Sequence, residues 1–307
     1  MPFGDNNIGG INLNLIAQDS LTTLLAEFPL ITKFTTNFGG EIATRGETVT
    51  TRIASRVESI TDIGDVGYEV SDVTSEPRQI VLNKHKGFVM GFSDGEVALG
   101  GYEVLRRTFI RPAAWAVSKA VLDDIFALVN ETNFPEVTPY GSTIYAGPEA
   151  SFDADAVARI SQAMTDRFVP QQNRILIVKP SLYTNLATDI AIQAQYASGT
   201  NAPLTENLLP RIHGFEINQY AAFPSGSVAG MKGIACNPES ILIATRQPAL
   251  PTNWYGNVAS ATDEKSGLTV QVREWYDGDK GKQKLSMSIL YGVVKGSVGT
   301  LGKIVCT

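Results

Sequence analysis

The sequence predicts a mixed protein of the α+β class, and three observations support this. From about Thr36 to Phe92, apolar and polar residues alternate, which is typical of strands. Between Tyr102 and Val129, apolar residues recur at helical spacing. From residue 151 to about 260, short helical and strand patterns alternate, as in an α/β or α+β domain. The 307 residues suffice for one large or two modest domains, each with its own core.

The N-terminal region predicts an arm followed by a short helix. Residues 1–19 are rich in Gly and Asn and would bury little surface, so we expect them to be extended. Asp19 or Ser20 can cap a helix whose apolar residues recur at helical spacing until Pro29 interrupts it. Residues 1–32 contain no Lys or Arg, and no stretch reaches the roughly 18 apolar residues of a membrane helix. We therefore expect neither a targeting peptide nor a membrane span.

Two alternating segments predict a long β-hairpin over residues 36–98. Val49, Ile53 and Val57 fall on one face of a first strand, and alternate residues from Ile80 to Phe92 form a second strand. The segment between them carries six acidic residues against one basic residue, Arg78: Glu58, Asp62, Asp65, Glu69, Asp72 and Glu76. Because an isolated two-stranded hairpin is marginal in water, we expect it to lean on another chain.

Basic residues flank the acidic tip of this hairpin. They are Arg45, Arg52, Arg56, Lys84 and Lys86. Hairpins of neighbouring subunits could therefore meet through complementary charge, and a solvated loop is the alternative interpretation. The residues that we consider candidates for contact between subunits are Arg52, Arg56, Glu58, Asp62, Asp65, Glu69, Asp72, Glu76, Lys84 and Lys86.

The strongest helical pattern follows the hairpin. A stripe that includes Val117, Val121 and Ile125 predicts a helix from about Tyr102 to Val129, roughly 40 Å long, with a bend near Pro112. The turn-rich segment after it marks a boundary.

The remaining elements are shorter. Asp153 can cap a helix whose buried face carries Val157, Ile160, Met164 and Phe168, ending at Pro170. Ile175–Val178, Gly214–Gln219, Gly233–Cys236 and Ile241–Ala244 predict strands, Ser181 begins a short helix, and residues 193–208 predict a surface loop. The end of the chain predicts a hairpin, with strands at Leu268–Trp275 and Leu285–Tyr291, and a last strand near Ile304.

No pattern typical of an enzyme or a metal site occurs in the sequence. The two histidines, His85 and His213, lie in different regions, and we expect each to be an ordinary strand or loop residue. Nucleophile-elbow and nucleotide-binding motifs are absent. Asp277, Asp279 and Gly281 faintly resemble the start of a calcium loop, but a hairpin turn fits better. We expect no catalytic residue, no cofactor and no metal.

The charge and the cysteine content narrow the class of protein to which the chain can belong. The net charge of −6 argues against a general polyanion-binding protein, although contact with DNA can still be local. Charged residues make up 18% of the chain, below the usual quarter, and extensive contact with other subunits is one explanation. Cys236 and Cys306 are too few for a disulfide framework, and we expect them to be buried. Adjacent carboxylates such as Asp123 and Asp124 are expected to be solvated or in salt bridges.

The order of these elements resembles the Hong Kong ninety-seven fold, shared by major capsid proteins of tailed bacteriophages and by encapsulin shells. Four stretches carry the resemblance: IVLNKHKGFVMGFSD, LLPRIHGFEINQYAAFP, NPESILIATRQP and GLTVQVREWYDGDKGKQKLSMSILYGVVKG. The resemblance implies five parts. These are an N-terminal arm at residues 1–35, an extended loop at 36–98, a peripheral domain with a spine helix at 99–150, an axial domain at 151–262, and closing peripheral strands at 263–307.

The resemblance also implies a function. The chain would be a major capsid protein that forms hexamers and pentamers of an icosahedral shell around double-stranded DNA, located in the virion and assembled in the host cytoplasm. A separate scaffolding protein and a portal are expected, with a decoration protein as a further partner and no contact with membranes. Arg106, Arg107 and Arg111 could face the packaged DNA or a neighbouring subunit, with intrahelical pairing to Glu103 as the simpler reading. The alternatives are an encapsulin-like compartment and a soluble enzyme or ligand-binding protein.

Overall fold

The computed structural model describes residues 13–27, 29–54, 75–100, 102–136, 141–190, 192, 209, 211–223, 228–252, 254–262 and 268–307. Its α-helices are α1 (Leu13–Glu27), α3 (Asp94–Gly100), α4 (Tyr102–Ala127), α5 (Ala154–Asp166) and α6 (Pro180–Thr188). Short 3₁₀ turns cover Pro29–Lys33, Glu149–Ser151, Pro238–Ser240 and Val298–Thr300.

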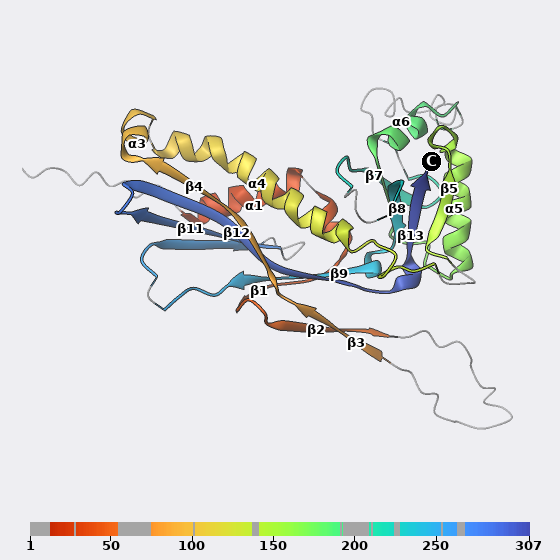
Figure 1. Ribbon diagram of the computed structural model, residues 1–307, viewed down its shortest axis with the longest axis horizontal. Coiled ribbons are helices and arrows are strands. Elements are labelled where there is room, and N and C mark those ends of the chain that lie inside the picture. The colour runs from red at the N-terminus through yellow and green to blue at the C-terminus, as the bar shows by residue number, and fades with distance from the viewer. Residues whose placement is uncertain are drawn as a thin grey trace, which may run out of the picture.

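The larger sheet contains six strands and forms the long body of the molecule (Figure 1). Its strands are β1 (Thr35–Ala43), β4 (Lys84–Ser93), β9 (Ile241–Pro248), β10 (Asn257–Thr262), β11 (Thr269–Asp277) and β12 (Lys282–Lys295). The strand order is β1-β9-β12-β11-β10, and β4 pairs with β12 on the edge opposite to β11. Strand β12 is therefore the centre of this sheet.

Helices α1 and α4 cover one face of the six-stranded sheet (Figure 1). On α4, Ala113, Val117, Val121 and Ile125 are buried, as the helical stripe in the sequence predicted. Each fully buried Val or Ile side chain contributes about 1.5–3 kcal/mol, so this stripe is a main source of stability. The predicted long helix is confirmed to within two residues at its C-terminal end.

The start of α1 corrects the expectation of an extended segment up to residue 19. The helix begins at Leu13, and its residues Ile16 and Ala17 are buried in the main core. Asp19 and Ser20 therefore lie inside the helix instead of capping it. A short helix is weak by itself, and packing of its apolar face against the body stabilises it beyond what local propensity predicts.

The predicted long hairpin is present only in part. Strand β2 (Thr48–Ala54) pairs antiparallel with β3 (Ser75–Val81), and these two strands form a separate ribbon. The second predicted strand is interrupted at Asn83, whose backbone N–H donates to the carbonyl of Val81 in a tight turn. Beyond this turn β4 pairs with β12 and buries Met90 and Phe92 in the main core, because a better apolar partner exists there.

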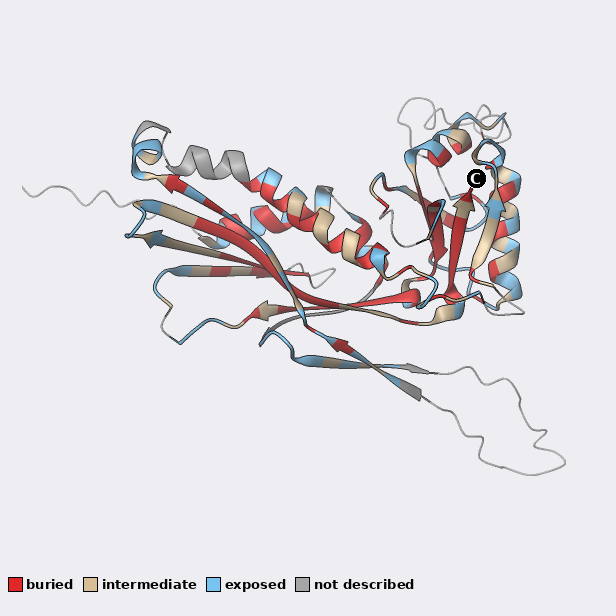
Figure 2. Ribbon diagram, in the orientation of Figure 1, coloured by how far each residue is buried: buried red, intermediate tan, exposed pale blue. Residues whose placement is uncertain are grey.

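The smaller unit is a five-stranded sheet with α5 and α6 packed near it (Figure 1). Its strands are β5 (Thr143–Gly147), β6 (Arg174–Val178), β7 (Phe215–Gln219), β8 (Met231–Cys236) and β13 (Leu301–Cys306), in the order β5-β13-β8-β6-β7. Buried residues run along β8, β13 and β12, whereas exposed residues dominate β2 and β3 (Figure 2).

The strand pairings divide the chain differently from the boundaries expected from sequence. Strand β5 of residues 99–150 and β13 of residues 263–307 both join the five-stranded sheet. Strands β9 and β10 of residues 151–262 join the six-stranded sheet instead. These pairings link segments far apart in the chain, and a local pattern of apolar residues does not specify them.

The helix α5 shows both a correct and an incorrect prediction. Asp153 caps it, and its carboxylate accepts a hydrogen bond from the backbone N–H of Ala156 at 2.9 Å. Phe168, expected on the buried face, lies beyond the end of the helix at a positive φ of 57° and is 77% exposed. The helix ends at Asp166, so the periodicity no longer applies to Phe168.

A buried arginine satisfies the end of α5. Arg174 is 1% exposed, and its guanidinium donates to the carbonyls of Ser161, Val169 and Pro170 and to the hydroxyl of Thr165. The carbonyls of Val169 and Pro170 lie in the segment after α5, and the carbonyl of Ser161 and the hydroxyl of Thr165 lie in its last turns. Together these oxygens satisfy the donors of the buried guanidinium, which would otherwise be costly to bury.

Candidate interaction surfaces

The two histidines and the two cysteines have ordinary structural positions in the described part of the chain. His85 lies in β4 and His213 in the turn before β7, so both are strand or loop residues. Cys236 and Cys306 are buried and unbridged, and burial raises the pKa of Cys236 to about 12.

No group of three or more potential metal ligands occurs among the described residues. No helix in these same ranges is both long and apolar enough to cross a membrane.

The residues proposed for contact between subunits fall into three sets. Arg52 is exposed on β2, and Glu76 lies on β3 opposite Ile53. Lys84 and Lys86 lie on β4. The other candidates lie outside the described residues: Arg56, Glu58, Asp62, Asp65, Glu69 and Asp72. These two residues thus lie on the two strands of one ribbon without facing each other, since Arg52 pairs with Pro77 and Glu76 with Ile53, while the lysines lie on a different sheet.

The two lysines form an ion cluster with the long helix of their own chain. Lys84 Nζ lies 3.1 Å from Asp124 Oδ1, and Lys86 Nζ lies 2.6 Å from Asp124 Oδ2. The hydroxyl of Tyr291 on β12 also donates to Asp124. Burial alone would raise the pKa of Asp124, but hydrogen bonds from Lys86, Tyr291 and Lys84 outweigh burial and lower it. This cluster joins β4, β12 and α4 at the point where the chain leaves the ribbon.

Asp123 makes separate contacts from the next position on α4. Its carboxylate lies 2.6 Å from Lys119 Nζ and accepts a hydrogen bond from the hydroxyl of Tyr220 at 3.2 Å. The expectation that Asp123 and Asp124 are in salt bridges is therefore confirmed. Their partners on β4, β12 and the loop after β7 were not predicted, because these partners are distant in sequence.

The candidate DNA-facing arginines lie in the first part of α4. Arg106 and Arg107 are in the helix, and their side chains lie outside the described part of the structure. Arg111 is exposed, and Trp115, one turn further along α4, is 47% exposed. A large aromatic side chain at the surface is a feature that interfaces favour.

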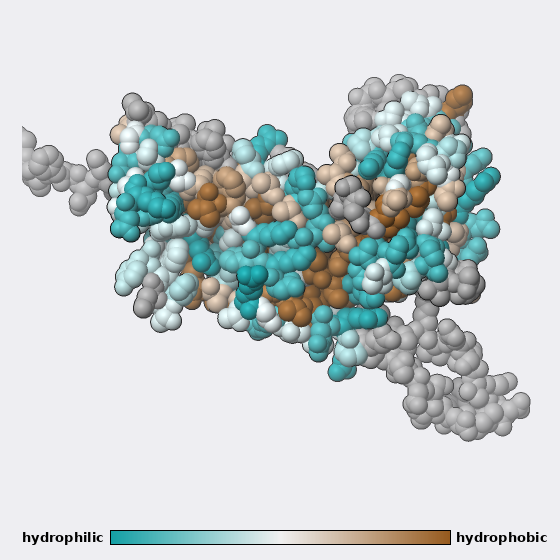
Figure 3. Space-filling model, viewed as in Figure 1, coloured by the Kyte–Doolittle hydropathy of each residue, from teal (hydrophilic) through white to brown (hydrophobic). Residues whose placement is uncertain are grey.

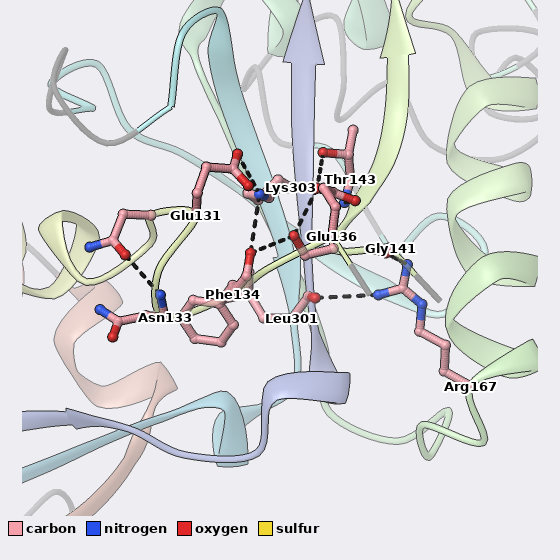
Figure 4. A network of polar contacts seen from close by, with 11 residues as sticks. Glu131, Asn133, Phe134, Glu136, Gly141, Thr143, Arg167, Leu301 and Lys303 are labelled. Carbon is pink, nitrogen blue, oxygen red and sulfur yellow. Dashed lines mark hydrogen bonds and ion pairs between the residues drawn. The ribbon is translucent and has the colours of Figure 1, made fainter. Parts of the chain in front are cut away.

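A buried lysine of β13 binds the segment that follows α4 (Figure 4). Lys303 on β13 is 0% exposed, and its Nζ lies 2.9 Å from Glu131, 3.1 Å from Glu136 and 3.2 Å from the carbonyl of Phe134. Burial would raise the pKa of Glu136, but hydrogen bonds from Thr143, Lys303 and others lower it to about 2. The segment after α4 is thereby fixed to β13 of the five-stranded sheet.

An open groove lies on the face of the six-stranded sheet opposite to the helices. It has a volume of about 290 Å³ and is bordered by His85 and Val89 of β4 and by Trp254, Arg273 and Trp275 on the other side. Even-numbered residues of β4 such as Lys86 reach α4, so the alternation of a strand directs His85 and Val89 away from the helices. The groove was not predicted, although Arg273 and Trp275 alternate on one face of a predicted strand.

Several large apolar side chains remain at the surface of the single chain. Phe88 is 43% exposed, Val89 is 57% exposed and Tyr255 is 87% exposed. Hydrophobic residues also reach the surface at several places on the face that Figure 3 shows, among polar and charged ones. Exposed apolar area of this kind is typical of a protein that contacts other chains.

Comparison with known proteins gives matches in structure alone. No protein-family model and no curated protein matches the sequence. The structure matches a chain of the capsid of Cyanophage P-SCSP1u with a TM-score of 0.58 at 10% identity, covering 90% of this chain and 86% of that chain. It matches the mature capsid of bacteriophage PhiM1 with a TM-score of 0.56 at 13% identity, covering 89% and 88%.

A third match has the same character. The capsid of Ralstonia phage GP4 matches with a TM-score of 0.56 at 11% identity, covering 89% of this chain and 86% of that chain. Identities this low establish the fold and leave residue roles open. The chain has the α+β fold of phage capsid proteins, the Hong Kong ninety-seven type that its sequence resembles.

Proposed function

We propose that the chain is the major capsid protein of a tailed bacteriophage. It assembles through hexamers and pentamers into an icosahedral shell that encloses double-stranded DNA. The observation that carries this proposal is the match to phage capsid chains over about nine tenths of both chains: 90% of this chain and 86% of the first one. A match that covers so large a share of both chains favours the same overall role.

The β2–β3 ribbon supports the proposal from within the chain. Thr48, Thr50 and Arg52 of β2 and Pro77 and Gln79 of β3 are all exposed. Among the side chains described there, burial is confined to the base of the ribbon, where Ile80 and the following Leu82 pack against β9 and β12. Two strands with so little burial are marginal alone, and contact with an adjacent subunit would stabilise them.

The parts of the chain can be assigned to the domains of the capsid fold. We assign the five-stranded unit to the axial domain around which hexamers and pentamers form, and the six-stranded unit with α4 to the peripheral domain. The β2–β3 ribbon supplies the extended loop, and the residues ahead of α1 supply the arm, whereas α1, β1 and β4 belong to the six-stranded unit. The buried Lys303 junction would keep the two units in a fixed relation within each subunit.

Several partners follow from this role. A separate scaffolding protein would guide assembly in the host cytoplasm, a portal would occupy one vertex, and a decoration protein would bind the finished shell. Arg106, Arg107 and Arg111 would contact packaged DNA or a neighbouring subunit. The role is structural and requires no catalytic residue and no cofactor, and the protein would reside in the virion.

Electron microscopy tests the proposal directly. The full chain is expressed with and without a co-expressed scaffolding protein and imaged by negative staining. We expect capsomers or closed shells in at least one condition. Discrete small particles in every condition would contradict the proposal.

A loop exchange tests the part played by the ribbon. In one variant, a short Asn-Gly turn replaces residues 55–74, which keeps the ladder from Thr48↔Val81 to Ala54↔Ser75. In a matched variant, a Gly-Ser linker of the original length replaces the same residues. We expect both variants to fold, as judged by circular dichroism, and neither to form shells. Normal shells from both variants would show that assembly does not need the ribbon tip.

A further inference from the structure

The C-terminal end of α5 holds a bulky side chain in a backbone conformation that such side chains rarely adopt. Phe168 has a φ of 57° and is 77% exposed. Two other non-glycine residues of the described chain have a positive φ, Asn173 and His213, and both residue types enter this region more often than Phe does. At Phe168 the subunit therefore carries backbone strain, and the phenyl ring gains little burial in return.

The contacts around Phe168 fix this strained turn. The N–H of Phe168 donates to the carbonyl of Thr165 at 2.8 Å. The N–H of Val169 donates to the carbonyl of Met164 at 3.0 Å, and both of these side chains are buried in the core of the five-stranded unit. The two bonds form a Schellman motif, in which glycine usually occupies the position of Phe168. Glycine would form the same turn without strain, so the turn by itself does not account for the phenyl ring.

The surroundings of the ring are those of an interface centre. Aromatic side chains are enriched in such centres, and a Phe side chain buries about 150–250 Å². The amide side chains of Gln171 and Gln172 follow within four residues, are exposed, and can donate hydrogen bonds around the ring. Backbone strain that a fold retains is concentrated at functional sites. In a chain that is proposed to function by assembly, such a site is a contact with another chain.

A groove on the same unit has a complementary form. It has a volume of about 460 Å³ and lies between the edge strand β5 and the first two turns of α5. Ile144, Tyr145 and Ala156 form part of its apolar lining, and Asp155 and Arg159 are exposed at its border. A carboxylate can accept hydrogen bonds from amide side chains, and a guanidinium can lie over an aromatic ring. This β5–α5 groove thus suits a phenyl ring that is surrounded by amides.

Phe168 cannot reach the β5–α5 groove of its own chain. The groove borders the start of α5, and Phe168 lies two residues beyond the end of the helix at Asp166. The 13 residues of α5 separate the two by about 20 Å, at about 1.5 Å per residue. Both α5 and β5 lie on the side of the five-stranded unit that faces away from α4 (Figure 1). The six-stranded unit of the same chain therefore does not cover them, and a second copy of the chain carries both partners.

We propose that Phe168 anchors contacts between copies of this chain, with its phenyl ring inserted in the β5–α5 groove of the adjacent copy. The inference rests on the proposed shell assembly and adds an anchor and a receiving surface on the five-stranded unit. Each copy provides one ring and one groove at separate places, so the contact can repeat from copy to copy around a closed ring. In the proposed hexamers and pentamers it joins each axial domain to the next.

Substitutions at Phe168 test the anchor in full-length chains. Phe168→Gly removes the ring and relieves the strain, so it should raise the thermal midpoint of the unassembled subunit by about 2 °C and lower the yield of shells by about tenfold. Phe168→Ala removes the ring and keeps the positive φ, so it should lower the yield equally without raising the midpoint. Circular dichroism measures the midpoint, and negative-stain microscopy measures the yield. A residue that only supports its own fold would not combine a gain in subunit stability with a loss of assembly.

Asn173→Gly is the matched control for relief of strain. It changes a nearby exposed residue with a φ of 59° and removes no aromatic ring. The variant should form shells at the yield of the unaltered chain. Phe168→Leu keeps a large apolar side chain and should lower the yield less than Phe168→Ala.

Photo-crosslinking tests the receiving surface. Benzoylphenylalanine in place of Phe168 keeps an aromatic ring and, on irradiation, bonds covalently to a neighbouring C–H group. In shells we expect crosslinked bands up to pentamers and hexamers on denaturing gels, and mass spectrometry should locate the attachment in residues 144–148 or 153–159. The same amino acid in place of Tyr255, an exposed residue between β9 and β10, should not attach there.

The outcomes distinguish the anchor from the capsid function. Shells from Phe168→Ala and Phe168→Gly at the unaltered yield would overturn the anchor and leave the capsid function standing. A lower thermal midpoint for Phe168→Gly would also overturn it, because the ring would then stabilise its own subunit. Crosslinks from position 168 to residues outside the groove would overturn the receiving surface. Absence of shells from the unaltered chain under every condition would overturn both proposals.

Discussion

Strands β3 and β4 follow each other in the chain with only Leu82 and Asn83 between them, yet they belong to different sheets. Strand β3 pairs with β2 alone, and Gln79 and Val81 on it are exposed. Strand β4 pairs with β12 over ten residue positions, from Lys84↔Tyr291 to Ser93↔Lys282, and buries two side chains under α4. The chain thus passes within two residues from a ribbon with little support to a strand that buries Met90 and Phe92 in the main core.

This difference separates two sources of stability. The body is stabilised by burial and by internally satisfied charges, so its energetics can be measured on a single subunit. The ribbon buries little within the subunit, so its contribution should become visible only when subunits meet. Changes in the body should therefore alter the free energy of unfolding, and changes in the ribbon should alter assembly.

The largest loss of unfolding free energy is expected from the aromatic cluster at the C-terminal part of α4. Phe126 of α4 is fully buried, with ring centroids 4.9 Å from both Tyr220 and Phe223. Phe126→Ala should lower the free energy of unfolding by about 3–5 kcal/mol, measured by urea denaturation. The control Ile42→Ala changes a side chain that is 67% exposed and should cost less than about 0.5 kcal/mol. Similar losses of unfolding free energy in the two variants would contradict the view that burial in the body stabilises the subunit.

The next effect concerns the junction between the sheets. Replacing Glu131 and Glu136 with Gln leaves the ammonium of Lys303 buried without a carboxylate. The double variant should lose about 3 kcal/mol of unfolding free energy, because a buried charge without its partner is costly. Arg52→Gln on the exposed β2 is the matched loss of a charge and should change the subunit's stability by under about 0.5 kcal/mol. A small effect at the junction would mean that Lys303 is reached by water.

A smaller effect is expected where the chain enters the ribbon. Gly46 has a φ of +98°, and a Cβ there would meet nothing within 4 Å. Gly46→Ala should therefore cost about 1–2 kcal/mol through backbone strain alone. Gly278→Ala, which has equally open space without a positive φ, should be close to neutral. Equal thermal midpoints for the two variants would show that the turn at Gly46 relaxes.

The smallest effect is a dependence on pH. The pKa of Glu136 is about 2 in the folded chain, below its ordinary value of 4.5. Its contribution is therefore fully present above about pH 4.5 and is lost as the pH falls towards about 2. The stability difference between the unaltered chain and Glu136→Gln should shrink over this range, by less than about 1 kcal/mol because Glu136 is partly exposed. Denaturation curves at several pH values measure it, and a constant difference would contradict the assignment.

Local features of the fold were predictable from sequence. The stripe of α4, the cap at Asp153 and the hairpin of β11 and β12 each depend on residues close together in the chain, and each is confirmed. The turn at Asp277 to Gly281 is likewise a hairpin turn, as expected. Such signals arise from side-chain periodicity and backbone preferences, which neighbouring residues determine.

Long-range pairing was not predictable in the same way. The parallel pairing of β1 with β9, for example Thr35 with Leu242, joins segments with no common local pattern. The partners of Lys303 also come from distant segments. The acidic segment at residues 58–76 could be recognised from its charge alone.

The central position of β12 has a consequence for synthesis of the chain. Strands β4, β9 and β11 all pair with β12, and all of them emerge from the ribosome before it. Until β12 is made, three strand edges are without their partner, and exposed edges of this kind can pair wrongly with other chains. Folding of the body should therefore wait for a late stage of translation, when β12 has been made.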